Sequence, residues 1–256
     1  MRYYIYISDS KVDMLLPQIP SEAKRKIATE FKIDLKVLSA LRKSETETTD
    51  NRFSRLEAVC AFIQDYGNVG SVAEPDDYVY GSMPLRMLTD RNFVYFGGSD
   101  QGTNTVVGLS GSVKHLIGIS PPTNAHGSSS LLSFTATFLR TIIDSIESSL
   151  EVSKVHLRDT LNDAVRVTRS MGGPEQHFEF LAKRLLYEKI LVKHLAYQKN
   201  VVVRFSDDGK PIYDEVDGKP AEAATEHKAQ ERTETYVLLA TPIYVALSDR
   251  PRFLNV

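Results

Sequence analysis

The sequence predicts an α+β fold in which a mainly antiparallel mixed sheet is covered by helices. Short segments of alternating large side chains cluster in the middle and at both ends of the chain, and two blocks of helical periodicity lie between them. Strands and helices therefore do not alternate one for one, as they do in doubly wound α/β proteins. A three-layer α/β arrangement is the alternative, since the first and last strands can also be placed as buried neighbours.

Composition and charge exclude several classes of protein. The 256 residues carry a formal net charge of -2, so there is no excess of positive charge for general nucleic-acid binding. Uninterrupted apolar runs stay well short of the roughly 20 residues that a membrane helix needs, and Met1 leads straight into a strand instead of a secretory signal. Cys60 is the only cysteine, which excludes an internal disulfide and favours a reducing compartment. We therefore expect a cytoplasmic protein that does not bind membranes.

The chain is short enough to form one large domain, because single cores stop growing at roughly 250–300 residues. No stretch has the composition of a linker that would force a split. Pro121–Ser130 contains turn formers and small polar residues and is predicted to be a loop that ends in a helix cap. Asp207–Glu234 is charged and contains two turn signals, so we expect a hairpin followed by a mobile excursion. The prediction is a single domain over residues 1–256.

The first quarter of the chain predicts a strand and two helices. Tyrosine and isoleucine alternate over Arg2–Ser8, as in a strand that is covered on at least one side. Asp9–Pro20 is expected to be a connection, because its two prolines each disfavour helix in the preceding residue. Ser21 then caps a helix that is expected to reach about Lys43. Asn51–Tyr66 has apolar residues at steps of three and four, which predicts an amphipathic helix with Cys60 in the core.

The middle of the chain predicts an antiparallel meander. Asp77–Leu88, Asn92–Gly97 and Thr105–Leu109 are short runs of large side chains separated by turn residues. Pro84 lies within the first run and indicates an edge strand or a bulge there, since proline cannot donate to a sheet. Gly97–Asn104 is predicted to be a hairpin connection.

The second half predicts helices and then strands. Leu131–Leu150 has one broad apolar stripe with charged residues opposite, which is typical of a helix that covers a sheet. Val155–Ser170 is predicted to be helical and to end at a glycine pair, and Pro174 is expected to open a further helix to about Lys199. The predicted strands that follow are Asn200–Ser206, Pro211–Glu215 and Thr235–Leu247.

The most suggestive stretch for chemistry is Thr105–Gly118. A predicted strand runs into a glycine-rich turn that contains Gly111 and Ser112, and a short helical segment with Lys114 and His115 follows. Glycines let a backbone approach a ligand closely, and a helix start favours an anion. The spacing matches neither a Walker pattern nor a dinucleotide fingerprint. A tight structural turn is the alternative, and an isolated glycine cluster is more often such a turn.

A second candidate segment follows the first predicted strand. Asp9, Ser10 and Lys11 lie where open sheets commonly place binding groups, just past the end of a buried strand. Asp9 and Asp13 suit a hard cation or a ribose, and Lys11 suits a phosphate. The alternative is that these side chains make ordinary turn hydrogen bonds, as such residues most often do.

Three functional hypotheses remain open. The first is a ligand-binding or sensor protein for a small anionic or nucleotide-like molecule held between Asp9–Lys11 and Gly111–His115. The second is a hydrolase or transferase in which His115 is the general base and Asp9 or Asp13 orients it or holds a metal. The third is a protein-interaction subunit or homo-oligomer, because the apolar face of Leu131–Ile146 and the tyrosine-rich strands exceed what one core would bury. No cofactor is assigned.

The other histidines give no assembled site. His156, Asp159 and Asp163 share one face of a predicted helix, but no second histidine or cysteine lies at ligand spacing, so a solvated face is favoured over a metal site. His177 is expected at a helix start and His126 in a mobile loop. We expect no metal ligands among them.

Three stretches together carry a resemblance to a known family. They are YYIYISDSKVDMLLPQIP at Tyr3–Pro20, FGGSDQGTNTVVGLSGSVKHLIG at Phe96–Gly118 and YVLLATPIYVALSD at Tyr236–Asp249. They resemble a bacterial family known only as a domain of unknown function. The resemblance covers nearly the whole chain and is weakest over Asp207–Arg232. It implies a single domain in a cytoplasmic bacterial protein, and it assigns no activity or site residue.

Overall fold

A computed structural model describes most of the chain. The described residues are 2–31, 49–90, 92–118, 131–146, 157–193, 201–205, 211–215 and 232–248. By its internal contacts the chain divides into two compact units, Met1–Glu188 with Tyr236–Val256 and Lys189–Thr235. The single-domain interpretation stays a prediction, and most of the expected excursion at 207–234 lies outside the described residues.

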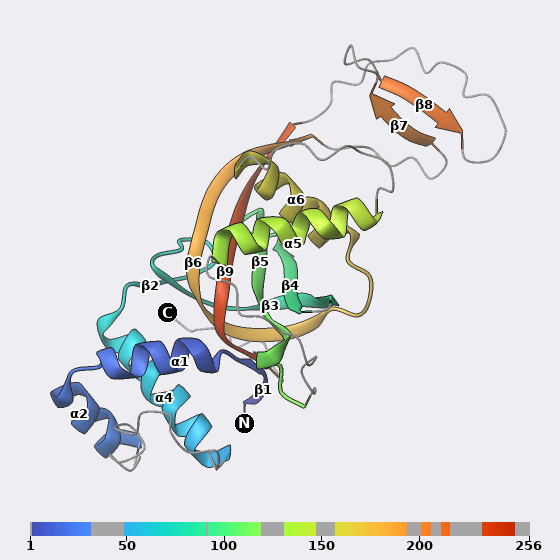
Figure 1. The fold of residues 1–256 in the computed structure, drawn as a ribbon. Coiled ribbons are helices and arrows are strands. Elements are labelled where there is room, and N and C mark those ends of the chain that lie inside the picture. Colours follow the sequence, from blue (N-terminus) through green and yellow to red (C-terminus); the bar gives the residue numbers. More distant parts are fainter. Residues whose placement is uncertain are drawn as a thin grey trace. The chain divides into compact units, whose positions relative to one another are not determined.

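The first unit is built around a closed barrel of five strands, which Figure 1 shows at its centre. The strands of its sheet are β1 (Tyr3–Ile7), β2 (Val69–Gly70), β3 (Tyr78–Asp90), β4 (Phe93–Asp100), β5 (Thr105–Ser112), β6 (Gln176–Lys193) and β9 (Arg232–Leu247). The end of β6 from Lys189 and the start of β9 up to Thr235 belong to the second unit. The order β9-β5-β4-β3 is closed by β6, which pairs with both β3 and β9, and β1 and β2 extend the sheet. β5–β9 and β2–β3 are parallel, whereas β1–β9, β3–β4, β3–β6 and β4–β5 are antiparallel. This confirms the predicted α+β class with its mainly antiparallel mixed sheet.

Apolar side chains from every barrel strand fill the interior. Val79, Phe96, Leu109, Phe180 and Leu238 come from five different strands and are fully buried. One methylene of buried apolar surface contributes roughly 0.8 kcal/mol, so this cluster is a main source of stability.

Two helices lie against the outer face of β4 and β5 (Figure 1). They are α5 (Leu131–Ile146) and α6 (Leu157–Ser170), which confirms the two helices predicted there. The Phe138 ring packs 5.1 Å from the Phe93 ring, and the Tyr95 hydroxyl lies 3.0 Å from Thr168 Oγ1. The described apolar residues of α5 are buried in this layer: Ala136, Phe138, Leu139, Ile142 and Ile143. Self-association through this helix stays a prediction.

A second core forms where the N-terminal helices meet β1 and β9. The helices are α1 (Asp9–Leu15), the 3₁₀ turn η1 (Leu16–Gln18), α2 (Ser21–Phe31) and α4 (Thr49–Tyr66). Cys60 is buried in this core, as predicted. The prediction that Asp9–Pro20 is only a connection is wrong, because Asp9–Leu15 forms helix α1. Pro17 restricts the residues next to it and leaves the preceding turns free to be helical. The predicted continuation of α2 to Lys43 lies outside the described residues.

The helix predicted from Pro174 to Lys199 is wrong, because Gln176–Lys193 is strand β6. Its glutamate, lysine and leucine content is typical of helices, but it pairs with β3 from Gln176↔Leu85 to Lys183↔Tyr78. Phe178 and Phe180 thereby reach the barrel interior. Tertiary pairing and burial outweigh a local preference that is worth less than about 1 kcal/mol per residue.

The turn predicted around Gly111 and Ser112 is also wrong, because β5 continues through Ser112, which pairs with Phe93 of β4. Glycine serves another purpose in this strand. A Cβ atom at Gly111 would lie 2.3 Å from Tyr6 Oη, and one at Gly108 would lie 2.3 Å from Tyr95 Oη. Both glycines make room for a buried tyrosine hydroxyl.

Pro84 lies next to a change of partner in β3, whereas its sequence position indicated an edge strand or a bulge. β3 pairs with β6 up to Leu85 and with β4 from Arg86 onward. Proline has no backbone N–H to donate, and its loss is tolerated where the ladder with one partner ends and that with the next begins.

The second unit contains a two-stranded hairpin. Its strands are β7 (Val201–Phe205) and β8 (Pro211–Glu215), which pair antiparallel and confirm the two strands predicted at these positions.

Candidate functional site

Three of the predicted site residues meet at one imidazole ring. Ser10 Oγ lies 3.2 Å from Nε2 of His115, and Asp9 Oδ2 lies 3.5 Å from Nδ1 of the same ring. Asp9 and Ser10 open helix α1, and His115 ends η2 (Val113–His115), the 3₁₀ turn that follows β5. The imidazole is buried, whereas Ser10 is exposed. The hydroxyl is thus open to solvent with a buried base behind it.

The surroundings of His115 favour its neutral form. Burial lowers the pKa of His115, the nearby carboxylate of Asp9 raises it in part, and Lys114 and Lys11 lower it again, so that it stays below its ordinary value. A carboxylate only accepts hydrogen bonds, so the proton of the neutral ring belongs on Nδ1, facing Asp9. Nε2 is then the acceptor for the Ser10 hydroxyl. Nδ1 makes no hydrogen bond of ordinary geometry within the described part of the chain, and Asp9 Oδ2 is 3.5 Å from it.

Arg52 of α4 holds the Asp9 carboxylate in place. Its Nε lies 2.8 Å from Oδ1 and its Nη2 lies 3.0 Å from Oδ2, a bidentate pair. Nη2 also donates to the Ile7 carbonyl at 3.3 Å. Burial alone would raise the pKa of Asp9, but His115 and Arg52 outweigh it and keep the pKa below its ordinary value. The carboxylate is therefore charged and fixed at neutral pH.

Lys11 lies beside this cluster but its ammonium is already held. Nζ donates to Ser8 Oγ at 3.2 Å and to the Pro242 carbonyl at 3.1 Å. Both partners are neutral, and burial lowers the pKa of Lys11 from 10.5 to about 8. The folded state therefore carries a buried cation without a carboxylate among these partners.

The free energy of unfolding is expected to rise with pH as Lys11 loses its proton. Between pH 8 and 10.5 the unfolded chain keeps this proton and the folded chain does not, so the unfolded state binds more protons and the slope is positive. From pH 7.5 to pH 9 we expect a gain of about 1 kcal/mol. Urea unfolding at several pH values measures it.

The Lys11→Met variant is the control. Its free energy of unfolding should lack the part of the rise that comes from Lys11 and keep the pH dependence that comes from the other titrating groups. Equal pH profiles for the two proteins would contradict the shifted pKa of Lys11.

The remaining predicted site residues lie on β5, η2 and α1. Gly111 is buried inside β5 under Tyr6, and Ser112 ends that strand. Lys114 is exposed on η2. Asp13 forms an ion pair with Arg55 of α4. The sequence left Asp9 and Asp13 open as partners of His115, and in the structure it is Asp9 that lies beside the imidazole.

His177, the other histidine that the structure describes, takes no part in this cluster. The expectation that His177 starts a helix is wrong, since it lies in β6 opposite Pro84. His126 and His156 lie outside the described residues. Within the described ranges, no three His, Cys, Asp or Glu side chains gather as metal ligands. Of the helices in those ranges, none has the length and apolar character needed to cross a bilayer.

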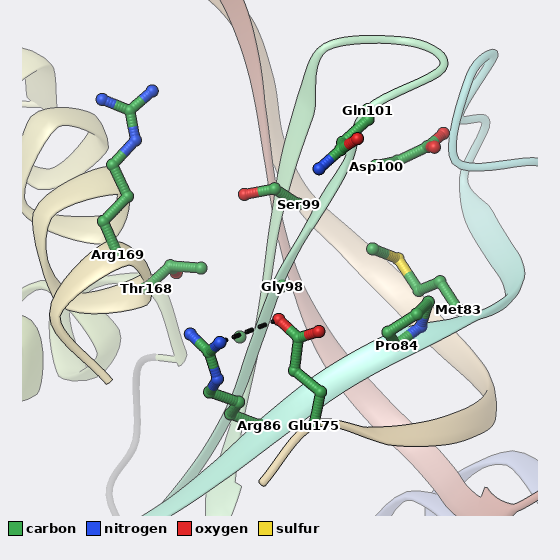
Figure 2. A pocket seen from close by; sticks show the side chains of 11 residues that line it. Met83, Pro84, Arg86, Gly98, Ser99, Asp100, Gln101, Thr168, Arg169 and Glu175 are labelled. Carbon is green, nitrogen blue, oxygen red and sulfur yellow. Dashed lines mark ion pairs between the residues drawn. The ribbon is translucent and has the colours of Figure 1, made fainter. Parts of the chain in front are cut away.

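A hollow of about 440 Å³ lies elsewhere on the first unit. It is lined by none of the residues that the sequence indicated for ligand binding, which are Asp9, Ser10, Lys11, Gly111, Ser112, Lys114 and His115. Figure 2 shows Arg169 of α6 on one side and Met83 and Pro84 of β3 on the other. Arg86 lies between them at the lower edge, where its Nη2 is 3.0 Å from Glu175 Oε1.

Sequence reasoning missed both Arg52 and the hollow. Arg52 lies on the polar side of an amphipathic helix, where arginine is common, and only its contact with a residue 43 positions away distinguishes it. The hollow is made by β3, β4 and α6, which no local pattern connects.

The fold and the cluster define an α+β protein with a closed five-stranded barrel and a serine–histidine–aspartate arrangement beside the end of β5. The chain belongs to the Family of unknown function (DUF7019), which it matches over residues 2–216. This confirms the family resemblance seen in the sequence. No curated protein and no solved structure matches the chain. Its bacterial source and cytoplasmic location stay predictions.

Proposed function

We propose that this protein is a hydrolase or acyltransferase for small ester or acyl substrates. Ser10 is the nucleophile, His115 the general base and Asp9 the group that orients the base. The observation that carries the proposal is that Ser10 Oγ and Asp9 Oδ2 face the two different nitrogens of one buried imidazole. This is the connectivity of serine hydrolases, which recurs on unrelated folds.

The arrangement supplies each proton that acyl transfer requires. Ser10 Oγ bonds to the carbonyl carbon while its proton passes to Nε2 of His115, and Asp9 stabilises the imidazolium. The bond from the carbonyl carbon to the leaving group then breaks, and Nε2 returns the proton to that group. Water repeats these steps on the acyl-enzyme and releases the acid. An alcohol or amine in place of water gives acyl transfer.

Charge and burial favour this proposal over a binding protein without catalysis. A general base must be neutral at the working pH, and the lowered pKa of His115 meets that requirement. An anion cradle would use the ammonium of Lys11, but this group already donates to Ser8 and Pro242. The 3.5 Å separation at Nδ1 is compatible with catalysis, since such hydrogen bonds often tighten only when substrate binds.

A fluorophosphonate probe tests the proposal directly, because an activated serine attacks its phosphorus and displaces fluoride. We expect covalent labelling of Ser10, located by peptide mass spectrometry, and loss of labelling in Ser10→Ala and His115→Gln. Ser170→Ala is the matched control, since that hydroxyl donates to the Val167 carbonyl and not to an imidazole. A protein that is folded but unlabelled at Ser10 would refute the proposal and return the binding protein as the better hypothesis.

A further inference from the structure

The Asp9 carboxylate is shared between a guanidinium and an imidazole. Arg52 Nε lies 2.8 Å from Oδ1 and Nη2 lies 3.0 Å from Oδ2, while Oδ2 is 3.5 Å from Nδ1 of His115. The side chains of Arg52 and Asp9 are only 28% and 26% exposed, so water screens their charges only in part. Both oxygens of Asp9 are thus bound closely by Arg52, and only one of them also faces the ring.

The guanidinium of Arg52 is itself fixed to the backbone. Its Nη2 also donates to the carbonyl of Ile7 at 3.3 Å, at the end of β1 and close to the start of α1. Asp9 cannot turn towards His115 without breaking a bidentate charged pair, whose hydrogen bonds are roughly twice as strong as neutral ones. This pairing accounts for the long separation between Asp9 and Nδ1.

We infer that Arg52 is a positioning residue of the proposed reaction, which keeps Asp9 facing the imidazole but prevents the close ion pair that would hold His115 protonated. A carboxylate without another cationic partner strongly stabilises an imidazolium in a part-buried site. A protonated His115 could not accept the proton of Ser10. The role of Arg52 in catalysis rests on the proposed function, whereas its effect on the charge of His115 does not.

The other groups that face His115 leave this role to Arg52 and Asp9. Lys11 of α1 and Lys114 of η2 are cations, and both lower the pKa of His115. The Tyr6 ring of β1 packs edge-on at 5.8 Å, and burial raises the pKa of its phenol, so it is neutral. Of these groups, Asp9 alone favours the charged ring. The charge of His115 therefore depends on how Asp9 is held.

Nuclear magnetic resonance titration of the His115 ring tests the inference without a substrate. We expect Arg52→Gln to raise the pKa of His115 by about 1 pH unit, because the Asp9 carboxylate can then bind the imidazolium closely. Arg52→Lys keeps the charge but not the two-point hold, so it should raise the pKa by less than about half as much. Because the effect depends on the carboxylate, Arg52→Gln should raise the pKa less than about half as much when Asp9→Asn is also present.

Asp13→Asn is the matched control, because it weakens another ion pair between the same two helices, that of Asp13 with Arg55. It should leave the pKa of His115 unchanged. The inference is overturned if Arg52→Gln leaves this pKa unchanged or lowers it, if Asp13→Asn raises it as much, or if Arg52→Gln raises it equally with and without Asp9→Asn. Far-UV circular dichroism confirms that each variant is folded.

The pH dependence of kcat/KM for p-nitrophenyl acetate separates this inference from the proposed function. The rate should fall at low pH as His115 gains a proton, and in Arg52→Gln this fall should occur about 1 pH unit higher, with a loss below about threefold at high pH. An equal loss at every pH would mean that Arg52 has no part in setting the base. If Arg52→Gln raises the pKa of His115 but neither protein hydrolyses the ester, the proposed function fails and the effect of Arg52 on His115 stands.

Discussion

The His115→Gln variant is expected to hydrolyse an activated ester such as p-nitrophenyl acetate about a thousandfold more slowly than the wild type. Glutamine fills a similar volume but cannot accept the Ser10 proton, and a positioned general base contributes 10²–10⁴-fold in rate. Ser10→Ala should lose as much. Because the two groups act as one unit, the double variant should be no slower than either single variant. Steady-state kinetics at pH 7.5 give these values of kcat/KM.

Ser170→Ala is the control for these rates and should equal the wild type, since the proposal gives that hydroxyl no part in the reaction. If the losses in the two single variants multiplied in the double variant, Ser10 and His115 would act independently. That result, or a loss below about tenfold in either single variant, would contradict a shared catalytic role.

The Gly111→Ala variant is expected to destabilise the protein by about 2–3 kcal/mol. The added methyl group would lie 2.3 Å from Tyr6 Oη, at the end of a ring that is fully buried. Overpacking of this kind costs about 1–3 kcal/mol because the surrounding core moves only with strain. The Tyr6 ring also packs edge-on against the His115 ring at 5.8 Å, so the variant should slow ester hydrolysis as well. Urea unfolding measures the change in stability.

Gly172→Ala is the matched control. A Cβ atom there has no heavy atom within 4 Å, so the free energy of unfolding should change by less than about 0.5 kcal/mol. Equal stabilities for the two variants would show that Tyr6 and β5 adjust without strain, contrary to the packing described above.

Helices with a clear apolar stripe were predictable from the sequence. α4, α5 and α6 have apolar residues at steps of three and four, and this period is a property of each segment alone. β6 was not predictable in this way. Its composition favours a helix, and its extended form depends on pairing with β3, nearly a hundred residues earlier in the chain.

The candidate site was predictable in part. The sequence indicates Asp9 and Ser10 because they follow a predicted strand, a position that a sheet often uses for binding. It indicates His115 because this residue lies in a short helical segment after glycines, where a helix start favours an anion. The contact between Ser10 and His115 joins residues 105 positions apart, and no sequence period indicates it. The sequence predicts a turn at Gly111, because glycine clusters are typical of turns. Only the fold brings Tyr6 next to Gly111 and shows that its ring leaves no room for a side chain there.

The sequence by itself determined the α+β class, the family and the amphipathic helices, because these depend on composition and on periods within one segment. Only the tertiary structure decided that five strands close into a barrel, that Asp9 and not Asp13 faces His115, and that β3, β4 and α6 line one hollow. Each of these depends on residues distant in the chain, whose approach is set by burial of the whole core and by the pairing of strands.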